Sequence, residues 1–129
     1  MDVQRFPTWP AIAVATFGIF LHGYINLIKA EVGPNLFTLG LLALSVLPYS
    51  ICLLVALLGK GSPLLGFAGA VGPLLSDLEL YHSVFVAPDS STAAIALLFG
   101  PLVNLLVLLP LGMLIGYGLA RWFGRRSAP

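Results

Sequence analysis

Three long stretches of the chain, residues 10–28, 36–58 and 93–120, contain no Asp, Glu, Lys or Arg. A helix needs about 20 mostly apolar residues to cross the hydrocarbon core of a bilayer, and each stretch is close to that length or longer. Polar and apolar residues do not alternate along them, so the pattern favours helices over the strands of a membrane barrel. We therefore expect an all-α integral membrane protein. Its single transmembrane domain, residues 1–129, would be a bundle of about four helices.

The composition is unsuited to a fold surrounded by water. Only 9% of the residues are charged, whereas a soluble domain usually has about 25%. The net charge of +1 offers no basic surface for a nucleic acid. The single cysteine, Cys52, excludes an internal disulfide and a cysteine-rich metal site, and its apolar surroundings in the sequence indicate a small packing residue.

The N-terminal stretch is interpreted as a first helix that is not cleaved. It is longer than the 7–15 apolar residues of a signal peptide. Ile28 also stands three positions before a possible cleavage after Ala30, where a small residue is preferred. We expect this helix to stay in the membrane.

A fourth span is expected at 63–87, short or irregular, because Gly72-Pro73 interrupts it and charged residues follow. The segment could instead be a short or re-entrant piece followed by an interfacial stretch. If it crosses, five basic residues share one side with both termini, and Lys29 stands alone on the other. The five are Arg5, Lys60, Arg121, Arg125 and Arg126. This positive-inside bias favours four spans, with both termini cytoplasmic in a plasma (inner) membrane of bacterial type.

Small and polar residues recur every three or four positions along the first stretch, and so lie on one helical face. They are Ala11, Ala15, Gly18, His22, Asn26 and Lys29. One interpretation is a packing stripe that contains a hydrogen-bonded histidine. The other is a polar cavity or proton path lined by His22 and Asn26, because an ionisable residue within a span is a functional candidate.

Asp77, Glu79 and His82 form the most polar point of the chain. On a helix, Asp77 and Glu79 point about 200° apart and cannot share a face. We interpret this stretch as a solvated cap at the outer face that helps to fix the topology. The alternative is a cation, metal or proton site formed with His22 and Asp89. No ligand spacing in the chain matches a known metal motif, so we expect neither a metal nor a cofactor.

The last stretch carries Gly112 and Gly116 in a GxxxG spacing, which allows close helix contact within the bundle or between copies. Asn104 is expected at the same contact, either in an interhelical hydrogen bond or lining a pore. Interfacial anchors are expected at both ends of the chain, at Trp9 and at Arg121, Trp122, Arg125 and Arg126.

These features favour a non-enzymatic accessory or assembly subunit, since the loops are short and no nucleophile elbow is present. Its partners would be the lipid bilayer and another membrane protein or further copies of itself, with no nucleic acid. The alternative is a small oligomeric channel or transporter. Its ion or proton path would use His22, Asn26, Asp77, Glu79, His82 and Asn104.

Overall fold

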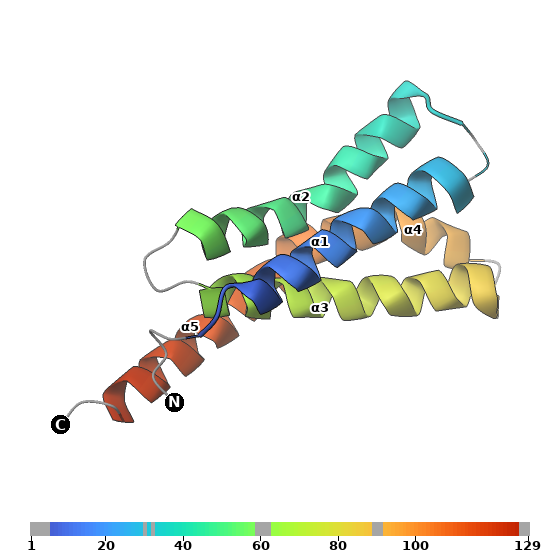
Figure 1. Cartoon of the computed structure of the whole chain (residues 1–129). Coiled ribbons are helices and arrows are strands. Elements are labelled where there is room, and N and C mark those ends of the chain that lie inside the picture. Colours follow the sequence, from blue (N-terminus) through green and yellow to red (C-terminus); the bar gives the residue numbers. More distant parts are fainter. Residues whose placement is uncertain (1–5, 30, 32, 59–62, 89–91, 127–129) are drawn as a thin grey trace.

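The computed structural model describes residues 6–29, 31, 33–58, 63–88 and 92–126, and this part of the chain is helical without strands. Several helices continue without a break into a π-helical turn (Figure 1). In order, the elements are α1 (Trp9–Tyr24), η2 (Ile25–Lys29), α2 (Leu36–Leu58), α3 (Pro63–Tyr81), η3 (His82–Val86), α4 (Ala93–Val103), η4 (Asn104–Leu108) and α5 (Leu109–Arg126).

The helix bounds follow the uncharged stretches closely. The second helix has the expected bounds, and the first differs by one residue at each end. The doubtful third segment is helical from Pro63 to Val86, and its irregularity is confined to the π turn at its end. The last helix continues to Arg126, beyond the expected end at 120. Arg5, Lys60 and Asp89 lie outside the described residues.

The start of α2 shows why the chain turns where it does. Gly33 has φ of +72°, a conformation that glycine adopts without the steric cost of a side chain. Asn35 Oδ1 then accepts a hydrogen bond of 2.9 Å from the backbone N–H of Thr38. The Thr38 hydroxyl accepts one of 2.9 Å in return from the backbone N–H of Asn35. This reciprocal pair satisfies amides that a helix otherwise leaves unpaired at its start.

The four rods run alternately up and down (Figure 1), so the start of α1 and the end of α5 lie at the same end of the bundle. We call this the Trp9 end, and the opposite end, near Lys29 and Phe85, the Lys29 end. Helix α3 is the central one, because it packs against α1, α2, α4 and α5. The least apolar rod therefore has the most protein around it.

Small residues bring the rods close together. Ala11, Ala15 and Gly18 are buried on α1, as the stripe predicted. Gly112 and Gly116 of α5 are also buried. A Cβ on Gly112 would overlap the backbone carbonyl of Ala68 in α3, and one on Gly116 would lie 3.0 Å from the Ala68 side chain. The GxxxG spacing therefore packs against α3 within the chain.

The exterior is largely apolar, with exposed Leu, Ile, Val, Phe and Trp side chains on every long helix. Three helices are long and apolar enough to cross a membrane: Trp9–Lys29, Leu36–Leu58 and Ile95–Arg126. The rod formed by α3 and η3 is not among them, because Asp77, Glu79 and His82 lower its hydropathy.

Candidate functional site

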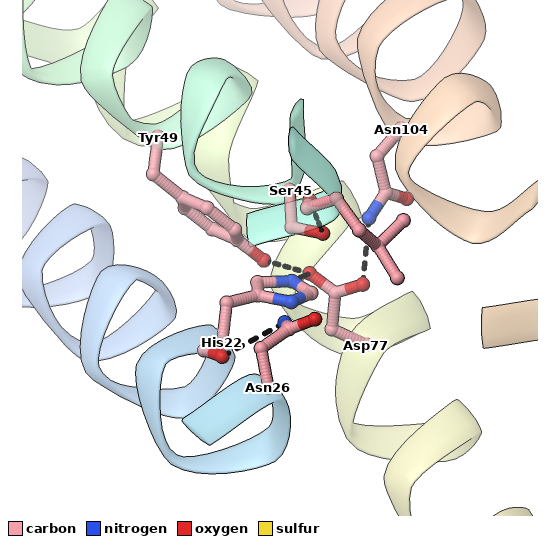
Figure 2. Close-up of polar contacts among 7 residues, drawn as sticks. His22, Asn26, Ser45, Tyr49, Asp77 and Asn104 are labelled. Atoms are coloured by element: carbon pink, nitrogen blue, oxygen red, sulfur yellow. Dashed lines mark hydrogen bonds and ion pairs between the residues drawn. The ribbon is translucent and has the colours of Figure 1, made fainter. Parts of the chain in front are cut away.

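Four helices meet at one buried carboxylate, that of Asp77 on α3 (Figure 2). His22 Nε2 on α1 lies 2.8 Å from Asp77 Oδ2. Tyr49 on α2 donates its hydroxyl hydrogen to the same oxygen. Asn104, where α4 continues into η4, donates from Nδ2 to Oδ1 at 2.7 Å. We call His22, Tyr49, Asp77 and Asn104 the Asp77 cluster.

The Asp77 cluster is closed to solvent. Asp77 is 1% exposed, Tyr49 and Asn104 are 0% exposed, and His22 is 4% exposed. A buried carboxylate is costly unless its oxygens receive hydrogen bonds, and here both oxygens do. His22 and Asp77 also form an ion pair when the imidazole is protonated. The cluster is therefore a satisfied polar centre inside an apolar bundle.

Prolines stand next to the cluster on three of its helices. Pro48 precedes Tyr49, Pro73 lies one turn before Asp77, and Pro101 lies three residues before Asn104. All three rings are less than 2% exposed. A proline has no N–H, so the carbonyl four residues earlier loses its helical partner and the rod is weakened at that point.

Two π-helical turns also begin at the cluster. Segment η2 starts three residues after His22, and η4 starts at Asn104 itself. Asn26, in η2, donates from Nδ2 to the carbonyl oxygen of His22 at 2.9 Å. Single π-helical turns inside α-helices are rare and often occur at functional sites.

A small enclosed cavity of about 60 Å³ lies beside the cluster. Four of its lining side chains are polar and buried: His22, Asn26, Ser45 and Asp77. Ser45 donates to the carbonyl oxygen of Leu41 at 2.8 Å. The apolar wall includes Leu97 and Pro101 of α4. A polar cavity of this size has room for one or two water molecules, which would be within reach of the His22–Asp77 pair.

One polar atom of the cluster has no partner among the described residues, Asn104 Oδ1, which is fully buried. A buried carbonyl oxygen without a hydrogen bond costs free energy. Asn104 thus gives its donor group to Asp77 while its acceptor group stays unsatisfied. The Asn104 side chain therefore stabilises the Asp77 carboxylate, and its own carbonyl oxygen is left without a donor.

The structure brings together four of the six residues expected to form a polar path: His22, Asn26, Asp77 and Asn104. Glu79 and His82 are exposed on other faces. The interpretation of this stretch as a solvated cap is therefore wrong for Asp77. The reason is its helical azimuth, which points inward from the central helix, whereas Glu79, two residues on, points outward.

Tyr49 and Ser45 are the site residues that the sequence analysis missed. Both lie on a buried face of α2 that also contains Thr38, Cys52 and Ala56. These five positions recur with helical spacing in a helix otherwise rich in leucine. The same search for small and polar residues that found the α1 stripe would have found this one.

The expected interfacial residues lie at the Trp9 end. Trp9 is 69% exposed and Trp122 is 48% exposed. The Arg126 guanidinium stacks on the Trp122 ring at 3.9 Å, and Arg121 lies over the Tyr117 ring at 5.7 Å. Arg125 is exposed beside them. These contacts hold the cations against aromatic rings at the end of α5.

The geometry of the Asp77 cluster suits proton binding. His22 Nε2 and Asp77 Oδ2 are 2.8 Å apart, close enough to share one proton, and the polar cavity adjoins them. The described residues contain no group of three or more His, Cys, Asp or Glu placed to hold a metal ion. A scan of protein-family models and searches of curated proteins and of solved structures found no match to this chain.

Proposed function

We propose that the chain is an integral membrane protein with four crossings. Its apolar exterior supports this, because exposed large apolar side chains cover the long helices. Aromatic rings gather at both ends, where the edges of a bilayer would lie. Tyr24, Tyr81 and Phe85 are in contact at the Lys29 end. Phe6 and Phe67 pair near the Trp9 end, where Trp122 and Phe123 also pair.

The directions of the rods support a crossing by α3. Helix α2 and the rod formed by α4 and α5 both run from the Lys29 end to the Trp9 end (Figure 1). If both cross, the chain between them must return across the bilayer, and α3 is the segment that does so. Its hydropathy is lowered by Asp77, which faces neighbouring helices, and by Glu79 and His82, which are exposed.

The orientation proposed from the charge bias puts the Trp9 end, with Arg121, Arg125 and Arg126, in the cytoplasm of a bacterial-type cell. The Lys29 end is then the outer end. The cations stacked on rings at the end of α5 suit an interface with anionic headgroups.

Within this bundle, we propose that the Asp77 cluster is the proton-binding site of a small non-enzymatic transport protein. The observation that carries the proposal is the buried contact of 2.8 Å between His22 Nε2 and Asp77 Oδ2. Ionisable groups within a span are expensive and usually mark ion or proton pathways. Two such groups from different helices share one hydrogen bond here.

The donor set favours a proton over a metal ion. Both oxygens of Asp77 already accept hydrogen bonds, from Tyr49 and Asn104. A metal ion would have to displace these donors to reach the carboxylate, whereas a proton needs no new ligand. Hard cations also require several oxygen ligands at once. Among the described residues, the Asp77 carboxylate is the only one that lines the cavity.

Charge balance explains how the site would work. With His22 protonated and Asp77 ionised, the pair is neutral overall, and the same holds when the proton resides on Asp77. Losing that proton leaves a net charge of −1, which is costly in an apolar interior. The pair therefore exchanges its proton only when water reaches it. Helices weakened at Pro48, Pro73 and Pro101 provide the places where the bundle would open.

Proton uptake by liposomes tests this proposal. The purified chain is reconstituted around a pH-sensitive dye, and a potassium gradient with valinomycin imposes an interior-negative potential. We expect the parent to acidify the lumen and Asp77→Asn to lose this uptake, because the amide cannot take part in proton exchange. The matched control is Glu79→Gln, which neutralises an exposed carboxylate two residues away and should keep the uptake.

Folding is checked for each variant by detergent size-exclusion chromatography, so that loss of uptake is not confused with loss of the bundle. Absence of uptake in the parent, or equal uptake in parent and folded Asp77→Asn, would refute a proton-transport role.

A second candidate function is that of an accessory subunit in a membrane complex, as the short loops favour. The observation that supports it is separate from the Asp77 cluster: Glu79 is exposed on the outer surface of α3. In a bilayer, an ionised carboxylate on this surface is costly unless a group of another protein pairs with it.

A further inference from the structure

A groove of about 320 Å³ runs between α3 and α4 on the outside of the bundle, and Glu79 lies in it. Ser76 of α3 and Ser83 of η3 belong to the same stripe of this continuous rod, one turn on either side of Glu79. The groove is completed by apolar residues, mainly of α4. We call it the Glu79 groove; its lining is Ser76, Glu79, Leu80, Ser83, Ala96, Phe99, Gly100 and Val103.

The position of Glu79 along the bundle is within the proposed span. It shares the groove with Phe99 and Val103, which are six and ten residues after Ala93, the first residue of α4. At 1.5 Å per residue, this level lies about 9–15 Å from the start of that helix. Phe99 and Val103 are themselves exposed. An ionised side chain facing lipid among such neighbours is costly unless it finds a partner.

Among the described residues, no Lys or Arg is paired with Glu79, and the exposed His82 lies one turn further along the rod. No ion pair to Glu79 is present among the described residues, where the ion pair found is that of His22 and Asp77. Lys29 lies over the Phe85 ring at the Lys29 end. The arginines of α5 are at the opposite end.

A second copy is a poor occupant of the groove. Two copies inserted in the same direction would meet about a two-fold axis along the membrane normal, and symmetry would bring Glu79 near Glu79. Two carboxylates facing each other in an apolar medium repel. His82, three residues further toward the Lys29 end, would likewise meet its own equivalent.

We propose that the Glu79 groove binds a transmembrane helix of another protein that carries a Lys or Arg within its span. The basic side chain pairs with the Glu79 carboxylate, and the serine hydroxyls on either side can add hydrogen bonds between the helices. Gly100 packs against Leu80 at the base of the groove, where a Cβ would lie 3.0 Å from Leu80 Cδ2. This proposal rests on the accessory role and is independent of proton binding at Asp77.

Photocrosslinking in native membranes tests the proposal. A photoreactive amino acid is placed at Ser83, within the groove, in chains that carry Glu79, Glu79→Gln or Glu79→Lys. Glu31→Gln is the matched control, because Glu31 is also an exposed glutamate but lies in the loop between η2 and α2. Crosslinked species are identified by mass spectrometry and quantified against the parent.

The expected result is one stoichiometric crosslinked protein whose contacting helix contains a Lys or Arg. Glu79→Gln should lower its yield by about 30-fold or more, the range measured when one member of a buried charge pair is truncated. Glu31→Gln should leave the yield unchanged. Exchanging the partner's basic residue for Glu should restore binding to Glu79→Lys.

Three results would overturn the proposal: an undiminished yield with Glu79→Gln, a crosslink to a second copy of this chain, or crosslinks to lipid alone. Proton uptake by the purified chain is measured without any partner. Failure of the Glu79 proposal would therefore leave that measurement, and the role of Asp77, untouched.

Discussion

At the scale of single residues, the Asp77 carboxylate accepts hydrogen bonds from groups that differ in whether they can change their charge. Asn104 and Tyr49 are neutral donors with fixed positions, whereas His22 can change its charge. In the proposed proton transport, the neutral donors would keep the carboxylate in place while the His22–Asp77 pair exchanges a proton. Stability and proton exchange therefore depend on different members of one cluster.

We predict that Tyr49→Phe lowers the free energy of unfolding by about 1.5–3 kcal/mol, the range for a hydrogen bond to a charged group. The substitution removes the hydroxyl that donates to Asp77 Oδ2 and keeps the buried ring. The measurement is reversible unfolding of the detergent-solubilised protein. Tyr24→Phe is the control, since Tyr24 is 41% exposed and lies outside the cluster. Equal stability of the two variants would show that the Tyr49 hydroxyl contributes nothing.

At the scale of helices, a glycine on α1 determines where the Tyr49 ring of α2 can lie. A Cβ on Gly18 would overlap the Tyr49 ring, so the hydroxyl reaches Asp77 only because α1 has no side chain there. Gly23, on the same helix, has no heavy atom within 4 Å of where its Cβ would stand. The two glycines make a matched pair for testing this contact.

Gly18→Ala is expected to destabilise the protein by about 1–3 kcal/mol, the usual cost of overpacking. Gly23→Ala should be neutral or slightly stabilising, because alanine favours a helix. In a double-mutant cycle, Gly18→Ala and Tyr49→Phe should be non-additive, since the alanine already displaces the hydroxyl. Additive effects would place the two residues in independent interactions.

Much of the helical layout could be predicted from the sequence, because length, charge and spacing are local properties. The bounds of α2 and the inward stripe of Ala11, Ala15, Gly18, His22 and Asn26 are examples. The contact of His22 with Asp77 agrees with one of the two interpretations of the Asp77 stretch, a site formed with His22, and not with a solvated cap. What the sequence could not supply is the direction in which α3 faces. That direction depends on packing against four other elements, and it separates Asp77 from Glu79 and His82.

At the scale of the whole molecule, the number of membrane crossings determines on which side of the membrane Pro88 lies. Glu31 follows η2 and Pro88 follows η3, whereas Arg125 is near the end of α5, so if all four rods cross, Glu31 and Pro88 share one side of the membrane and Arg125 lies on the other. If α3 did not cross, Pro88 would lie on the opposite side of the membrane from Glu31. Both Glu31 and Pro88 are exposed, so cysteines placed there can be labelled.

We predict that a membrane-impermeant maleimide added to intact cells labels Glu31→Cys and Pro88→Cys, but not Arg125→Cys. The variants are made in a Cys52→Ala background, which removes the buried thiol. Arg125→Cys should be labelled after the membrane is permeabilised, which controls for its reactivity. Protection of Pro88→Cys in intact cells, with Glu31→Cys labelled, would contradict four crossings.

The convergence of four rods on one carboxylate also sets an order for biogenesis. A ribosome produces α1, α2 and α3 before α4, so His22 and Tyr49 are available to Asp77 while Asn104 has yet to be made. In the proposed membrane bundle, until the last rod is inserted, Asp77 Oδ1 would lack its donor and the side of α3 that α5 later covers would face lipid. A chain that stops early therefore displays a half-satisfied acid within the membrane. Completion of the bundle gives Asp77 Oδ1 its donor. The Asn104–Asp77 hydrogen bond that stabilises the finished protein therefore also distinguishes the finished protein from an unfinished one.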